Sequence, residues 1–91
     1  MTIYTWDAAK RKSNLRKHGL DFADACAVLE AEALVIEDFR HDYGEQRYNA
    51  YGWWNAQIVC ITYTERRNGL RIISFRKATR QESRRYLRRS G

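Results

Sequence analysis

The sequence has only two cysteines among its 91 residues, and they offer little for disulfide or metal chemistry. Cys26 and Cys60 lie far apart in apolar surroundings, and neither has a histidine or a second cysteine at metal-ligand spacing. We therefore expect reduced thiols in the cytosol, no metal site and no cofactor.

Long apolar runs are missing as well. No run approaches the roughly 20 residues of a membrane span, and residues 1–6 lack the basic-then-apolar order of a signal peptide. The sequence also has no repeat, low-complexity tract or linker, and 91 residues leave room for one modest core. We therefore expect a single domain over residues 1–91, cytoplasmic and with no membrane partner.

Positive charge is what the sequence has in excess. It contains 17 Lys and Arg against 11 Asp and Glu, which gives a formal net charge of +6. This balance favours a polyanionic partner such as nucleic acid. The hydrophobic content of 44% argues against disorder.

Cap residues predict three helices. Asp7 and Asp21 are suitable N-caps for helices over residues 8–17 and 22–30, and Gly19 ends the first of them. The segment Thr79-Arg80-Gln81-Glu82 matches a capping box, so a last helix is expected to begin at Thr79.

Runs of β-branched and aromatic residues predict five strands, at residues 3–6, 34–37, 47–53, 57–65 and 70–76. Helices do not alternate with strands in the order β-α-α-β-β-β-β-α. The fold is therefore expected to be α+β, with a mainly antiparallel sheet and the first two helices on one face.

Two short turns are predicted to connect the last three strands. Asn68-Gly69 is the stronger hairpin signal, since a type I′ turn needs positive φ at both central positions, and 54–57 is a weaker one. With Asn68 and Gly69 as loop residues, Glu65 is expected to share a face of the sheet with Arg76.

His18 and Arg76 stand where regular elements are expected to end, and such junctions can aim a side chain at a ligand. His18 has an ordinary pKa close to neutral and is a candidate for proton transfer, with Lys17 beside it. Arg76 could stabilise charge on phosphorus, and Glu65 could orient it. Alternatively, His18 only bonds the carbonyls at its helix end, and Arg76 forms a surface ion pair with Glu65. His41 is a weaker catalytic candidate.

Further residues are candidates for phosphate contact because they bear positive or amide groups on faces expected to be exposed. Lys10, Asn14 and Lys17 recur at i, i+4 and i+7 on the first helix, although a solvated charged face is an equal alternative. The predicted RNA-binding set is Lys10, Asn14, Arg47, Arg80, Arg84 and Arg88. Trp53 and Trp54 must point to opposite faces of their strand, so at least one is expected in the core.

Several segments, taken in order, resemble the successive motifs of the BrnT toxins of bacterial toxin–antitoxin systems. The ordered Lys-His-Gly and Ile-Ser-x-Arg blocks are more specific together than either alone. The segments are Tyr4-Thr5-Trp6-Asp7, Asn14 through Phe22, Glu45-Gln46-Arg47-Tyr48, Tyr63-Thr64-Glu65-Arg66 and Arg71 through Thr79. The likeness covers nearly the whole chain and departs from the usual pattern at residues 53–56.

This resemblance implies a RelE-like fold and metal-independent cleavage of RNA in translation arrest. It also implies neutralisation by a BrnA-type antitoxin with a ribbon-helix-helix part, so that operator DNA is contacted only through the antitoxin. Carried over by position, it points to Lys17, His18 and Arg76, and also to Arg47 and Glu65. Two alternatives remain open at this point. They are a gyrase-inhibiting toxin on the same fold and a non-catalytic module that binds RNA or the antitoxin.

Overall fold

The computed structural model describes residues 2–40 and 42–90, so His41 lies outside the described residues. Three helices and five strands follow one another as β1 (Ile3–Thr5), α1 (Ala8–His18), α2 (Phe22–Glu30), β2 (Leu34–Asp38), β3 (Arg47–Trp54), β4 (Gln57–Arg66), β5 (Gly69–Lys77) and α3 (Arg80–Ser90). The element order and the α+β class confirm the prediction from the sequence.

The strands form one sheet in the order β1-β5-β4-β3-β2. The pairs β2–β3, β3–β4 and β4–β5 are antiparallel, and the short β1 adds to β5 in parallel. The consecutive antiparallel strands form the predicted meander, which needs no crossover helices.

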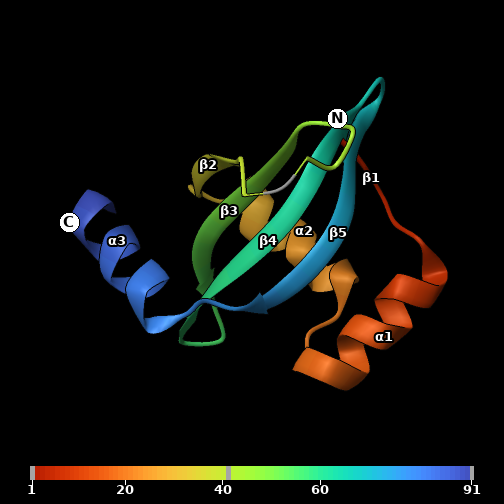
Figure 1. Ribbon diagram of the computed structural model, residues 1–91. Coiled ribbons are helices and arrows are strands. Elements are labelled where there is room, and N and C mark those ends of the chain that lie inside the picture. The colour runs from red at the N-terminus through yellow and green to blue at the C-terminus, as the bar shows by residue number, and fades with distance from the viewer. Residues whose placement is uncertain (1, 41, 91) are drawn as a thin grey trace.

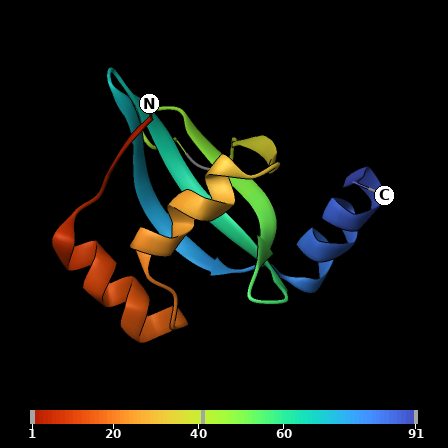
Figure 2. The same cartoon turned by 180° about the vertical axis from the view of Figure 1, so that it is seen from behind.

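One face of the sheet, which we call the packed face, carries the main hydrophobic core. α2 lies across it, and α1 runs beside β5 on the same side (Figure 2). A Cβ at Gly52 would come within 2.9 Å of Val28 Cγ1, so this glycine allows α2 to approach β3 closely. The sheet residues of the packed face are Ala50, Val59, Ile61, Tyr63, Ile72 and Phe75.

The other face, which we call the polar face, is turned toward the viewer in Figure 1. Its residues on β3, β4 and β5 are Arg47, Asn49, Tyr51, Cys60, Thr62, Thr64, Arg71, Ser74 and Arg76. α3 covers only one end of this face, and Figure 1 shows most of the helix projecting beyond the sheet. Tyr86 of α3 is buried and packs with Tyr51, Ile58 and Cys60.

The caps predicted from the sequence are present. The Asp7 side chain accepts a hydrogen bond from the N–H of Lys10 at 3.0 Å, and Asp21 accepts one from Ala23 at 3.1 Å. At α3 the two bonds of the capping box join Thr79 and Glu82 reciprocally, at 2.8 and 3.1 Å. These bonds satisfy amides that the first turn of a helix leaves without partners.

The hairpin turns differ from the prediction. The β4–β5 loop is Arg67-Asn68, and neither Asn68 nor Gly69 has positive φ, so the expected type I′ turn at Asn68-Gly69 is wrong. Gly69 is instead required because a Cβ there would overlap the backbone carbonyl of Ile3 in β1. The left-handed pair lies in the other hairpin, at Asn55 and Ala56, with φ of 52° and 62°.

The two tryptophans before that hairpin point to opposite sides, as their alternation predicts. Trp54 packs against the core of the packed face, whereas Trp53 is 55% exposed and meets Tyr86 edge to face at 6.5 Å. Within the described residues, no helix has both the length and the apolar character to cross a lipid bilayer.

Candidate active site

The buried side chain of Asn14 fixes the end of α1 against the end of β5. Its Nδ2 donates to the carbonyl oxygens of Phe75 at 2.8 Å and Leu20 at 3.0 Å, and its Oδ1 accepts from the N–H of Phe75 at 3.1 Å. Asn14 is therefore part of the scaffold. Its assignment to an exposed RNA-binding face was wrong, because the side chain is buried and both its amide hydrogens bond to the backbone.

His18 and Lys17 form the exposed last turn of α1. Gly19 ends the helix in the left-handed conformation, and its N–H bonds to the carbonyl of Leu15 at 2.8 Å. Partial burial lowers the pKa of His18, and the positive charges of Lys17 and Arg76 lower it further. The charges of Lys17 and Arg76 thus both act on His18, and they favour the neutral form of its imidazole.

Arg76 lies on the polar face, opposite Cys60 of β4, and its side chain is 21% exposed. Its guanidinium makes a bidentate contact with Glu82 of α3, at 2.8 and 3.0 Å. Hydrogen bonding to Glu82 raises the pKa of Arg76 despite its partial burial. An ion pair was considered from the sequence, but the partner is Glu82 and not Glu65.

Glu65 does not belong to this group. One extra residue in β5 shifts the register between Thr62 and Tyr63, so Arg76 pairs with Cys60 while Glu65 pairs with Leu70 on the packed side. Glu65 is also five residues from Cys60 along β4, which is about 17 Å in an extended strand. The prediction that Glu65 and Arg76 share one face is therefore wrong, because a β-bulge reverses the alternation of side chains along β5.

Glu82 is the residue of this site that the sequence pattern did not reveal. Besides the two bonds from Arg76, its carboxylate accepts the N–H of Thr79 at 2.8 Å and the hydroxyl of Tyr51 at 3.2 Å. The hydrogen bonds from Arg76 are the main reason why the pKa of Glu82 is lowered to about 2. The capping box identified Glu82 as a helix cap, but its pairing with Arg76 depends on how α3 returns over the sheet.

A hollow of about 400 Å³ lies beside this carboxylate, between α3 and β2. Asn49, Tyr51 and Glu82 form part of its wall, and Arg85 lies over the Tyr51 ring at 5.8 Å from the ring centre. Deeper in the sheet, the Thr62 hydroxyl donates to Asn49 Oδ1 at 2.7 Å. The polar face therefore offers amide, hydroxyl and guanidinium groups next to Arg76.

The remaining predicted RNA contacts lie outside this cluster. Arg47 is on the polar face, but it contacts Glu45 at 3.3 Å and stacks on Tyr43 at 4.1 Å from the ring centre. The side chains of α1 and α3 assigned to RNA are exposed, and they are Lys10, Arg80, Arg84 and Arg88. They can contact a long polyanion but are not positioned by surrounding groups for chemistry.

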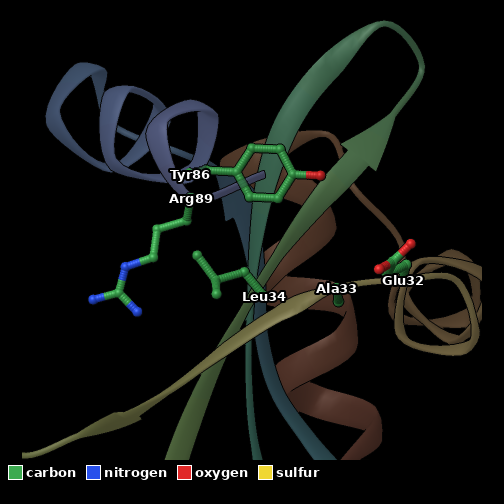
Figure 3. A pocket seen from close by; sticks show the side chains of 5 residues that line it. All are labelled: Glu32, Ala33, Leu34, Tyr86 and Arg89. Atoms are coloured by element: carbon green, nitrogen blue, oxygen red, sulfur yellow. The ribbon is translucent and has the colours of Figure 1, made fainter. Parts of the chain in front are cut away.

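A second hollow, of about 310 Å³, separates α3 from the start of β2 (Figure 3). Tyr86 and Arg89 of α3 and Leu34 of β2 line it, with Glu32 at its far end. Figure 3 shows the guanidinium of Arg89 extending away from the Glu32 carboxylate. None of the candidate catalytic residues lines this hollow, so we place the candidate site at Arg76 and His18.

Comparison with known proteins identifies a family for this chain. The family model described as ribonuclease toxin, BrnT, of type II toxin-antitoxin system matches residues 6–82. Because the match covers most of the 91 residues, the chain belongs to this family. A search of curated proteins finds no match. In the described part of the chain, no group of three or more His, Cys, Asp or Glu side chains could hold a metal ion.

Proposed function

We propose that this BrnT-family chain is a metal-independent endoribonuclease that arrests translation by cutting RNA. The observation that carries the proposal is the position of His18, whose pKa is lowered, within the electrostatic influence of Arg76. A neutral imidazole can accept a proton at cellular pH, and a guanidinium can stabilise the charge that develops on a phosphoryl group.

The reaction begins when the 2′-hydroxyl of the RNA attacks the neighbouring phosphorus. His18 takes the hydroxyl proton, while Arg76 and Lys17 stabilise the negative oxygens of the pentavalent phosphorus. The bond from phosphorus to the 5′-oxygen then breaks, and the imidazolium of His18 or the ammonium of Lys17 protonates the leaving oxygen. The products are a 2′,3′-cyclic phosphate and a 5′-hydroxyl end.

Glu82 supports this scheme as a positioning residue. A bidentate carboxylate holds the plane of the guanidinium, so Arg76 loses less rotamer freedom when it binds a phosphate. The remaining N–H groups of Arg76 are then available to the phosphoryl oxygens. The positive side chains Lys10, Arg47, Arg80, Arg84 and Arg88 contribute affinity for the RNA backbone and take no part in the chemistry.

Membership in a type II toxin-antitoxin family implies a protein antitoxin as partner. We propose that this partner is a BrnA-type antitoxin with a ribbon-helix-helix domain. The complex then contacts operator DNA only through the antitoxin. We further propose that the toxin acts in the cytoplasm. Neutralisation is simplest if the antitoxin covers the corner between α1 and the end of β5, where His18 and Arg76 lie.

An RNA digest with the purified protein tests the proposal. We expect cleavage to persist in EDTA and to leave 2′,3′-cyclic phosphate and 5′-hydroxyl ends, identified by end-group analysis. A preparation of His18→Ala, purified in parallel, controls for contaminating nuclease. Activity that disappears with EDTA and returns with Mg²⁺, or products with 5′-phosphate ends, would contradict the mechanism.

A further inference from the structure

The hairpin end of the polar face, far from His18 on α1, is a separate basic region. A hollow of about 440 Å³ lies there between β1 and the β4–β5 hairpin. Arg66, Arg67 and Arg71 line it together with Ile3 and Thr5. Three arginines line this one hollow, and such a concentration of positive charge attracts anions.

Arg67 and Arg71 are the two arginines of this hollow that have donors to spare. The side chain of Arg66 is paired with Glu45 at 3.0 Å, whereas the side chains of Arg67 and Arg71 make no hydrogen bond or ion pair within residues 2–40 and 42–90. The positive charge of Arg71 acts on the carboxylate of Asp7. The N–H of Lys10 is the main cause that lowers the pKa of Asp7, and the charge of Arg71 adds to it.

The bulge in β5 places Arg71 on the same face as Arg76. Arg76 lies five positions after Arg71, and an odd offset would point the two side chains to opposite faces of a regular strand. The register shift between Thr62 and Tyr63 adds one residue to β5, and Arg71 then pairs with Thr64 just as Ser74 pairs with Thr62. Bulges commonly redirect side chains in this way.

Uncharged polar groups lie along the polar face between the two arginines. They are Asn49, Thr62, Thr64 and Ser74. The backbone distance from residue 71 to residue 76 is on the order of 15 Å in an extended strand. This is more than one phosphate group can bridge, so a single ligand that contacts both ends must be a chain with several phosphates.

We propose that Arg67 and Arg71 form a second phosphate-binding site for single-stranded RNA. The strand lies along β5 over the polar face, with its scissile phosphate at Arg76 and a phosphate a few nucleotides away at the hairpin. Bidentate contacts from guanidinium groups suit phosphate oxygens, and unpaired RNA can extend over a sheet. The position of the scissile phosphate rests on the proposed nuclease function, whereas binding at the hairpin can be measured without cleavage.

Binding of a 2′-O-methyl dodecanucleotide, which lacks the attacking hydroxyl, tests the site through fluorescence anisotropy over a range of salt concentrations. Each phosphate contact on a single strand adds roughly 0.7 to the salt slope, so Arg67→Gln with Arg71→Gln should lower the slope by about 1.4. That change corresponds to binding on the order of 20-fold weaker at about 0.1 M salt, with convergence near 1 M.

The matched control is Lys12→Gln with Arg16→Gln, which removes the same charge. Both residues are exposed and lie on the side of α1 opposite Asn14, away from the sheet. The control should leave the slope nearly unchanged. An equal loss in the control, or an unchanged slope in the hairpin variant, would overturn the second site. Wild-type protein that binds with the expected slope but cuts no natural RNA would overturn the nuclease and still support this site.

Discussion

The two faces of the sheet are built on different principles. The packed face is covered by α2 and holds fully buried side chains such as Phe75 and Ile61, which lock the domain together. The polar face has α3 over one end only, held there by the ring of Tyr86 and the carboxylate of Glu82. Consecutive residues of β5 therefore face different surroundings, the packed core on one side and the site of the proposed phosphate chemistry on the other.

This division explains why Arg76 can be ordered without being buried in the core. Its neighbour Phe75 fixes the backbone, both through its buried ring and through its bonds to Asn14, while Glu82 holds the guanidinium from the other side. A functional side chain on a rigid strand keeps its geometry better than one on a loop. The following experiments test whether the two faces are as independent as this description requires.

The largest expected effect is the loss of cleavage at the candidate site, where the end of α1 meets the end of β5. His18→Ala and Arg76→Ala should each lower the single-turnover rate by about 10² to 10⁴, because they remove a proton-transfer group or an oxyanion donor. Arg11→Ala is a suitable control, since it breaks another bidentate pair, with Asp21 at 2.7 and 2.9 Å, on the helix side of the molecule. Full activity of both site variants at equal folded concentration would disprove the assigned roles.

The next effect is on stability and compares adjacent residues of β5. Phe75→Ala should lower the free energy of unfolding by about 3 to 5 kcal/mol, because it opens a cavity in the packed core. Ser74→Ala, one residue away on the polar face, should change it by less than about 1 kcal/mol. Urea titration monitored by tryptophan fluorescence measures both values. Similar losses for the two variants would show that the polar face also carries the stability of the fold.

A smaller effect is the pH dependence that Glu82 contributes. Its pKa falls from 4.5 to about 2 in the folded protein, so its stabilisation is complete above about pH 4.5 and is lost as the pH falls toward 2. We expect Glu82→Gln to lower the free energy of unfolding by the order of 2 kcal/mol at pH 7, and the two proteins to converge near pH 2.

Asp21 and Asp38 also have lowered pKa values, but they titrate in both proteins, so the difference between the two stability curves isolates Glu82. A constant difference from pH 7 to pH 2 would mean that Glu82 acts through packing and not through its charge.

Much of the fold could be predicted because it depends on local signals. Capping aspartates, the Thr79–Glu82 capping box and strand composition are readable within a few residues, and each gave an element close to the observed one. His18 and Arg76 could be selected as candidates for the same reason, since His18 is the last residue of α1 and Arg76 the last but one of β5.

The errors concern relations between distant segments. The bulge in β5 reverses the alternation at one residue, and no local signal marked it, so Glu65 was grouped with Arg76. Asn14 was expected on an exposed face because its bonding partner, Phe75, is 61 positions away in sequence. Glu82 was recognised as a cap, but its contact with Arg76 depends on the path of the chain between β5 and α3.

The buried amide of Asn14 also has a consequence for the solution behaviour of the protein. β1 covers β5 only from Gly69 to Arg71, so the outer edge of β5 continues without a neighbouring strand. There the Asn14 side chain bonds both the N–H and the carbonyl of Phe75, as a residue of an adjacent strand would do. One side chain thus occupies two backbone groups that a strand added along this part of β5 would need, and such coverage makes an edge less able to pair with another chain.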